Sequence, residues 1–138
     1  MKTYRYLMTA VILLVSFVCI SQVSAKNKLV PKIYAFGFSA SFNDSTVYFT
    51  DVQEVDSVWI NDKNGFLLNR ADYSYQLKNY FDGKSMPHRT CMIMFALKPK
   101  KIDKMYKKMK NKYTKKGNFD VKYISSNEFR FKAVTVDQ

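Results

Sequence analysis

The N-terminus has the three-part pattern of a secretory signal, which limits how much of the chain is left to fold. Lys2 and Arg5 come first, residues 7–20 are almost entirely apolar, and residues 23–25 are the small-residue run Val-Ser-Ala. The apolar run is shorter than the roughly 18–20 residues that a membrane-spanning helix needs. We therefore expect residues 1–25 to be a signal peptide that is removed, leaving an exported protein, periplasmic or secreted, without a transmembrane segment.

A lipid anchor on Cys19 is the alternative to a cleaved signal. The two residues before this cysteine are Phe17 and Val18, whereas lipoprotein signals usually have small residues there. The sequence therefore favours simple cleavage after Ala25.

The chain after residue 25 has 113 residues, which is enough for one hydrophobic core and predicts a single domain over residues 26–138. Cys91 is its only cysteine, so no disulfide can form within it. Packing alone must stabilise the fold, and the 11 phenylalanines and 10 tyrosines of the whole chain suit this requirement because each ring buries a large area.

Alternating residues predict a β-hairpin near the start of this domain. Within residues 32–42 the bulky side chains, including Phe36 and Phe38, fall on one face and small ones on the other. Asn-Asp-Ser at 43–45 is typical of a turn, and 46–50 (TVYFT) is rich in β-branched and aromatic residues.

The next segment gives mixed signals. Residues 51–56 combine helical spacing of valines with strand-like neighbours, so we expect an irregular stretch followed by a short strand at 58–60. A turn is expected at 61–65, which reads Asn-Asp-Lys-Asn-Gly.

A first helix is predicted between Asn69, a good N-cap residue, and Gly83, a good terminator. This helix has one apolar face, which we expect to pack on the sheet, and Tyr75 points away from that face. The residues of that face are Tyr73, Leu77, Tyr80 and Phe81.

Residues 89–97 are apolar on both alternating faces, which is typical of a strand in the middle of a sheet with cover on each side, or of an interface. A second helix is predicted from Pro99 to Gly117. Its apolar positions form one narrow stripe, made of Ile102, Met105, Tyr106, Met109 and Tyr113.

The last two alternating segments, 119–123 and 128–133, predict a second hairpin. The expected order is β-β-(β)-α-β-α-β-β. We therefore predict an α+β fold in two layers, with a mostly antiparallel sheet of about five to six strands and two helices against it.

The positive charge is concentrated on the second helix. Residues 98–116 contain ten lysines against Asp103 alone, a local charge of +9 in a chain whose net charge is +12. Such a face can bind anions, or it can simply keep a helix soluble. The candidate anion-binding residues are Lys101, Lys104, Lys107, Lys108, Lys112 and Lys115.

Anionic lipid, acidic glycan or an envelope protein are the partners that fit this face. Nucleic acid fits less well because the helix has no arginine for bidentate contacts, and Tyr106 and Tyr113 lie on the apolar stripe rather than among the lysines.

The sequence shows no recognisable catalytic or metal-binding pattern. His88 is the only histidine, and Cys91, three residues on, would point to the other face of an extended strand. The one carboxylate-rich region has no metal-loop spacing and is typical of solvated turns; it contains Asp51, Glu54, Asp56 and Asp62. No catalytic residue, metal or cofactor is therefore expected.

Three stretches resemble a family of small uncharacterised exported proteins of Bacteroides-type bacteria. They are residues 41–53 (SFNDSTVYFTDVQ), 73–81 (YSYQLKNYF) and 89–91 (RTC). This resemblance implies a location in the cell envelope and no particular activity.

We therefore expect an exported, non-enzymatic module that binds an anionic envelope component through its lysine-rich helix. A protein-interaction or oligomeric structural subunit is the alternative, using strand 91–97 or a hairpin edge. An enzyme would need Asp51, Glu54, Asp56 and His88 to converge in one pocket.

Overall fold

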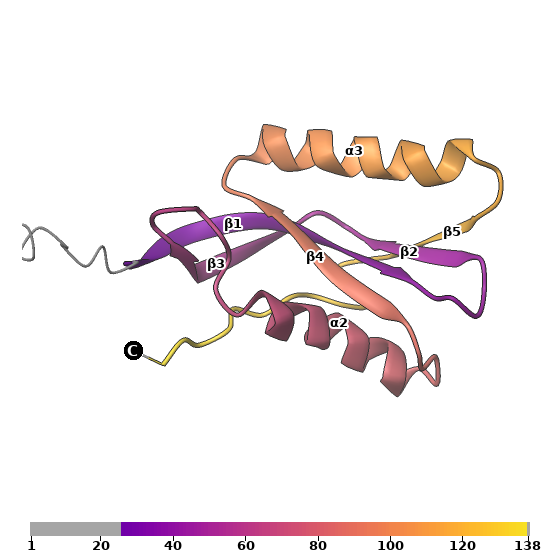
Figure 1. The fold of residues 1–138 in the computed structure, drawn as a ribbon, viewed down its shortest axis with the longest axis horizontal. Coiled ribbons are helices and arrows are strands. Elements are labelled where there is room, and N and C mark those ends of the chain that lie inside the picture. Colours follow the sequence, from indigo (N-terminus) through magenta and orange to yellow (C-terminus); the bar gives the residue numbers. More distant parts are fainter. Residues whose placement is uncertain (1–25, 138) are drawn as a thin grey trace, which may run out of the picture.

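The computed structural model describes residues 26–137, which form an α+β domain with a mixed, mostly antiparallel sheet and two helices (Figure 1). The predicted fold class is confirmed. The expected signal peptide and Cys19 lie outside the described residues. Within 26–137, no helix is both long enough and apolar enough to span a bilayer.

The strand β1 forms the centre of the sheet. The elements in chain order are β1 (Asn27–Ala40), β2 (Thr46–Thr50), β3 (Gln53–Asn61), α2 (Arg70–Gly83), β4 (Thr90–Ala96), α3 (Pro99–Lys115) and β5 (Asp120–Ile124). Phe38 in β1 pairs with Phe49 of β2 on one side and with Met92 of β4 on the other. The strands β2 and β3 follow each other along the same side of β1, and β5 pairs with β2.

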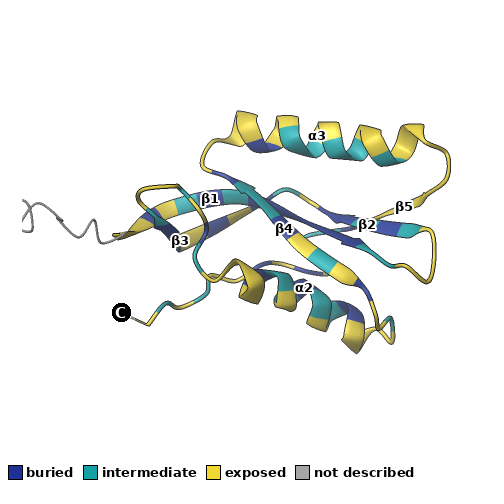
Figure 2. Cartoon of the chain, in the orientation of Figure 1, coloured by how far each residue is buried: buried dark blue, intermediate teal, exposed yellow. Residues whose placement is uncertain are grey.

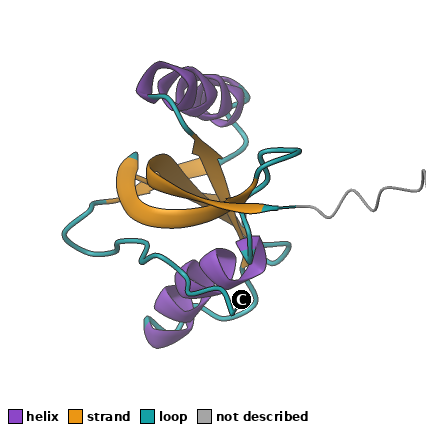
Figure 3. Ribbon diagram, turned by 90° about the vertical axis from the view of Figure 1, so that its left-hand side faces the viewer, coloured by secondary structure: helices purple, strands orange, loops and turns teal. Residues whose placement is uncertain are grey.

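The two helices lie on opposite faces of the sheet (Figures 1 and 3). Each helix is a crossover connection between two parallel strands. The strands β3 and β4, joined by α2, are both antiparallel to β1 and so parallel to each other. The strands β4 and β5, joined by α3, are also parallel, because β2 is antiparallel to β1 and parallel to β5. The chain crosses the sheet in one direction through α2 and returns in the other through α3. Crossovers between parallel strands keep one hand, so opposite directions require opposite faces. The domain therefore has three layers, whereas the sequence suggested two.

Each helix covers its own hydrophobic cluster, as its apolar stripe predicted. On one face of the sheet, Tyr73, Leu77 and Phe81 of α2 are buried against Ile33 and Ile93, among others. The other cluster is made by the α3 residues Ile102, Met105, Tyr106, Met109 and Tyr113 with Phe36, Phe38 and Phe49 of the sheet. Tyr75 is exposed, as expected.

The predicted ends of the helices are largely correct. Pro99 begins α3, which ends shortly before Gly117 (φ 65°), and Gly83 is the last residue of α2. Asn69 does not cap α2 with its side chain, because it adopts a left-handed conformation (φ 53°). Its amide instead donates to the carbonyl of Thr135 at 3.5 Å.

The expected irregular stretch at 51–56 is partly wrong, since β3 begins at Gln53. The side chains of β3 change face at Ser57, which has φ 55°, so Val55 and Val58 are both buried although they are three residues apart. Pro31, which has no N–H to donate, lies opposite Ser57 in the antiparallel register. This break in the period of two explains why the strand resembled a helix in sequence.

The strand β4 lies at an edge of the sheet and not in its middle, because within residues 26–137 it pairs with β1 alone. Both of its faces are apolar because a helix covers each one. Ile93 packs in the cluster under α2, whereas Met94 and Ala96 pack in the cluster under α3.

The second predicted hairpin is wrong. The strand β5 pairs in parallel with β2, and the segment 128–137 forms no regular strand. This C-terminal segment instead crosses to the α2 face, where Phe129 and Phe131 are buried in the core.

Glutamine side chains replace the missing neighbour strand along the C-terminal segment. Gln53 donates from Nε2 to the Phe129 carbonyl (2.8 Å) and accepts at Oε1 from the Phe131 N–H (2.9 Å). Gln76 of α2 makes the same pair of bonds, both 2.8 Å long, with the backbone of Lys132. A carboxamide offers one donor side and one acceptor side, as a peptide group does, so it can satisfy an extended backbone.

Replacing Gln53 by leucine is expected to lower the free energy of unfolding by roughly 2–4 kcal/mol, because a buried carbonyl and a buried N–H lose their partners. Gln76→Leu is the matched control and should cost less than about 1 kcal/mol, since its hydrogen bonds with Lys132 are exposed and water can replace them. Urea denaturation of the two variants measures the difference. Equal losses would contradict the structural role of Gln53.

Candidate functional site

The side of α3 that faces away from the sheet is exposed (Figure 2), and the lysines of residues 98–116 make it a basic face. Every one of the six candidate residues, from Lys101 to Lys115, is exposed. Lys110 differs, because it is half-buried and its Nζ lies 5.1 Å from the centre of the Tyr123 ring. The six candidate lysines are thus accessible from solvent.

No carboxylate of residues 26–137 neutralises this face by an ion pair. The four ion pairs of the described residues lie elsewhere and join Lys32 to Glu54, Lys78 to Asp82, Arg89 to Asp44 and Lys122 to Asp120. The first turn of α3 also has no acidic residue. Asp103 is the one carboxylate within residues 98–116, and it forms no ion pair with the lysines there.

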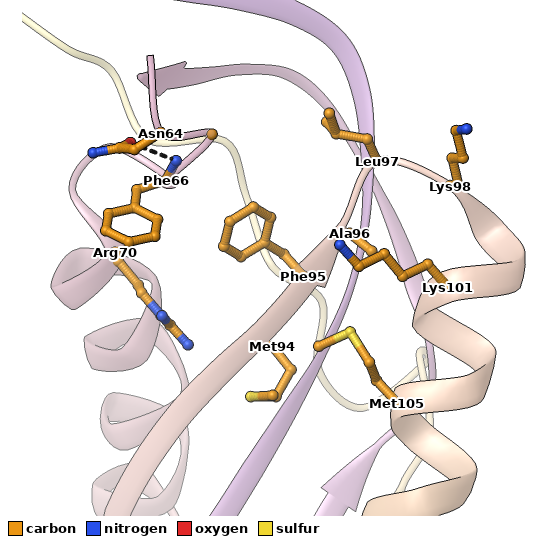
Figure 4. A pocket seen from close by; sticks show the side chains of 11 residues that line it. Asn64, Phe66, Arg70, Met94, Phe95, Ala96, Leu97, Lys98, Lys101 and Met105 are labelled. Atoms are coloured by element: carbon orange, nitrogen blue, oxygen red, sulfur yellow. Dashed lines mark hydrogen bonds between the residues drawn. The ribbon is translucent and has the colours of Figure 1, made fainter. Parts of the chain in front are cut away.

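Two grooves that share lining residues adjoin β4 beside the basic face. The first, which we call the edge groove, is lined among others by Phe66, Arg70, Leu97 and Lys101 (Figure 4). The second, the methionine groove, is lined by Met94, Met105, Lys108, Met109, Lys112 and Tyr113. Met94 and Met105 line both grooves, so the two are continuous.

The six candidate lysines do not all lie at these grooves. Lys101, Lys108 and Lys112 line them, and their spacing of seven and eleven residues places them in one row along α3. The other three candidates, Lys104, Lys107 and Lys115, line neither groove. The fold thus divides the basic face into a row beside β4 and a remainder turned toward solvent.

His88 and Cys91 do not form a catalytic pair in the described residues. His88 is exposed, and its carbonyl accepts a hydrogen bond from Ser41 Oγ at 3.3 Å. The Cys91 thiol donates to Ser39 Oγ at 3.5 Å. Burial raises the pKa of this thiol, and the Ser39 hydrogen bond and the charge of Arg89 oppose the shift only in part. A protonated thiol is a poor nucleophile.

The acidic residues also do not converge. Asp51 accepts hydrogen bonds from the N–H and hydroxyl of Ser126, and Glu54 pairs with Lys32 at 2.9 Å. Asp56 and Asp62 are exposed. Within residues 26–137, no group of three or more histidine, cysteine or carboxylate side chains is close enough to hold a metal ion.

Sequence reasoning missed Arg89, whose side chain is only 4% exposed. Its guanidinium donates to the Thr46 carbonyl (2.6 Å) and to Ser39 Oγ (2.9 Å), and it pairs with Asp44 at 3.3 Å. It also lies 4.7 Å from the centre of the Tyr48 ring. These bonds fasten the start of β4 to the turn between β1 and β2, so the role of Arg89 is structural.

Comparison with known proteins gives no further assignment. The chain matches no protein-family model, no curated protein and no solved structure.

Proposed function

We propose that this protein is an exported, non-enzymatic binding module that holds an anionic macromolecule of the cell envelope on the basic face of α3. The observation that carries this proposal is the concentration of ten lysines against one aspartate in residues 98–116, with no ion pair to them from within 26–137. The signal-like pattern of residues 1–25 supports the export.

The arrangement of the lysines supports binding because it costs stability in the free protein. Lys100, Lys104, Lys108 and Lys112 follow one another at intervals of four residues, and like charges at this spacing repel each other on a helix. A polyanion that neutralises these four lysines relieves the repulsion between them and also releases its own counterions.

The chemistry of the basic face favours electrostatic attraction over recognition of nucleotide bases. The basic residues of α3 are all lysines, which act as point charges, and the rings of Tyr106 and Tyr113 pack on the sheet side of the helix. Stacking platforms for nucleotide bases would have to be exposed. Acidic lipid, acidic glycan and acidic protein all fit the proposal better than nucleic acid.

Changing four lysines of α3 to glutamine is expected to abolish salt-sensitive binding without unfolding the protein. The variant replaces Lys104, Lys107, Lys108 and Lys112. Because each lysine near an anionic surface contributes roughly 1 kcal/mol, the affinity for vesicles of anionic lipid should fall by about two to three orders of magnitude. Flotation with anionic and with neutral vesicles across a salt series measures this loss, and heparin resin measures the affinity for an acidic glycan.

The matched control changes four exposed lysines outside α3 and so removes the same charge. It replaces Lys26, Lys28, Lys63 and Lys132. We expect this control to lose far less affinity than the α3 variant. If the wild-type protein is not retained on anionic vesicles or on heparin at low salt, or if the two variants behave alike, the proposal is wrong.

A further inference from the structure

We propose that the anionic partner is a protein, and that the free edge of β4 binds an extended acidic segment of it as an additional β-strand. This inference rests on the proposed function, since the lysines of α3 supply part of the attraction. Five observations carry it: the direction of the β4 backbone groups, the position of Arg70, the grooves on both sides of the edge, the exposed apolar residues beside it, and the charge around the grooves.

The backbone of β4 has hydrogen-bonding groups directed away from the sheet. The Gly37 N–H donates to Thr50 Oγ1, so the backbone of Gly37 faces β2 and those of Phe36 and Phe38 face β4. Phe36 pairs with Met94, and Phe38 pairs with Met92. Since successive residues of a strand face alternate neighbours, Cys91, Ile93 and Phe95 direct their N–H and C=O groups outward. An edge of this kind is a template for another strand.

Arg70 of α2 satisfies the middle of this edge. Its Nη2 donates to the Ile93 carbonyl at 2.8 Å, and its guanidinium lies 5.9 Å from the centre of the Phe95 ring. A side chain can turn away from a carbonyl when a backbone N–H takes its place. The guanidinium, which lines the edge groove, would then meet a carboxylate of the incoming segment.

Grooves lie on both sides of the edge, as an added strand requires. The edge groove extends across the edge, from Arg70 of α2 to Lys101 of α3, and the methionine groove lies on the α3 side (Figure 4). A third groove lies on the α2 side and is lined by Ala71, Ser74, Tyr75, Lys78 and Cys91. The alternate side chains of an added strand point to opposite faces, so they would enter grooves on either side.

The surface around the edge is apolar and exposed, which favours a partner with apolar residues at alternate positions. Phe66 is 66% exposed and Leu97 is 49% exposed, and both line the edge groove. Figure 4 shows Phe66 and Phe95 approaching the groove from two different segments of the chain.

The charge selects an acidic partner. The three grooves are lined by six cationic side chains and by no carboxylate; these are Arg70, Lys78, Lys98, Lys101, Lys108 and Lys112. A second copy of this chain joined edge to edge would bring two such rims together, and like charges at an interface oppose association. An acidic segment of another protein is therefore the occupant that the geometry favours.

The first test selects partners from a library of random peptides displayed on phage, with the purified protein as bait. Enriched peptides should alternate apolar residues with aspartate or glutamate. When the best peptide is added, hydrogen exchange of the Cys91 and Phe95 amides should become slower, since these N–H groups join the new ladder. If no peptide is enriched, or if binding leaves both amides unprotected, the inference is overturned.

The second test separates this inference from general attraction to anions. One triple variant replaces the groove row, Lys101, Lys108 and Lys112, by glutamine. Its control replaces Lys100, Lys107 and Lys115, which removes the same charge away from the grooves. We expect the groove variant to bind the selected peptide at least about tenfold more weakly and the control to change by less than about threefold.

Binding of the same variants to anionic vesicles and heparin makes the two failures distinguishable. General attraction to anions predicts equal losses for both triples. If both triples bind the peptide equally well while vesicle or heparin binding falls, the inference is overturned and the proposed function stands. If the protein binds neither vesicles, nor heparin, nor any peptide, both are overturned.

Phe66→Ala tests the apolar part of the site. The side chain is exposed, so its removal should not affect folding, whereas it should weaken peptide binding by about tenfold if the ring becomes buried in the complex. Phe42→Ala, at a fully exposed phenylalanine that lines none of the three grooves, is the control and should leave the affinity unchanged. Equal affinities of the two variants would overturn the placement of the peptide in the edge groove.

Discussion

Phe131→Ala is expected to lower the free energy of unfolding by roughly 3–5 kcal/mol, a large part of the stability of a domain this size. The ring is 5% exposed and lies edge-on to Phe129, with 4.9 Å between ring centroids. The C-terminal segment belongs to no strand, so its buried side chains and the two glutamines hold it in place. Removing the ring leaves a cavity between the sheet and α2 and loosens the segment.

Urea or thermal denaturation of Phe131→Ala measures this loss, with Phe42→Ala as control. Phe42 is fully exposed, so its replacement should change the stability by less than about 0.5 kcal/mol. Hydrogen exchange is a second measurement. The Phe131 and Val134 amides, which donate to Gln53 and Tyr73, should lose protection and exchange faster in the variant. A stability equal to that of the control would mean that the C-terminal segment is not part of the core.

Gly37→Ala is expected to destabilise the protein by roughly 1–3 kcal/mol or more, although it adds a single methyl group. A Cβ at this position would lie 2.7 Å from Leu77 Cδ2, 3.0 Å from Phe131 Cζ and 3.1 Å from Thr50 Cγ2. These atoms belong to α2, the C-terminal segment and β2, so three parts of the chain would have to move. The cause is close packing, since the backbone of Gly37 is an ordinary strand.

Gly83→Ala is the matched control for Gly37→Ala. A Cβ there meets nothing within 4 Å, and Gly83 ends a helix, so alanine should leave the stability unchanged or raise it by about 0.5–1 kcal/mol. A Leu77→Ala background gives a second check, because the shortened side chain makes room for the new methyl group. Gly37→Ala should then cost less than in the wild type. Unchanged cost in this background would exclude the clash with Leu77 as the cause.

The sequence alone predicted the features that depend on local pattern. The bulky and small faces of β1 identified a strand, and the stripe from Ile102 to Tyr113 identified α3 and the side on which it packs. The basic face was predicted from the same helical period, because lysines occupy most of the helix positions outside the apolar stripe. These features are local, since side-chain direction repeats every two residues in a strand and every 3.6 in a helix.

The sequence did not predict which strands pair. Residues 119–123 and 128–133 alternate equally well, yet only the first pairs in the sheet, in parallel with β2, while the second is held by Gln53 from more than 70 residues away. Residues 90–96 were apolar on both faces and so resembled a central strand, but the two helices supply the cover and leave one edge open. Pairing is decided by non-local contacts that have no period.

The candidate site divides in the same way. The charge of α3 and its exposure were determined by the sequence. Lysine is almost never fully buried without a partner, so a helix with this many lysines must expose most of them to solvent. The tertiary structure alone decided that Lys101, Lys108 and Lys112 stand beside the open edge of β4, with Arg70 and Phe66 on its other side. The reason is physical: one hand of crossover places α2 and α3 on opposite faces, so that the edge of β4 lies between them.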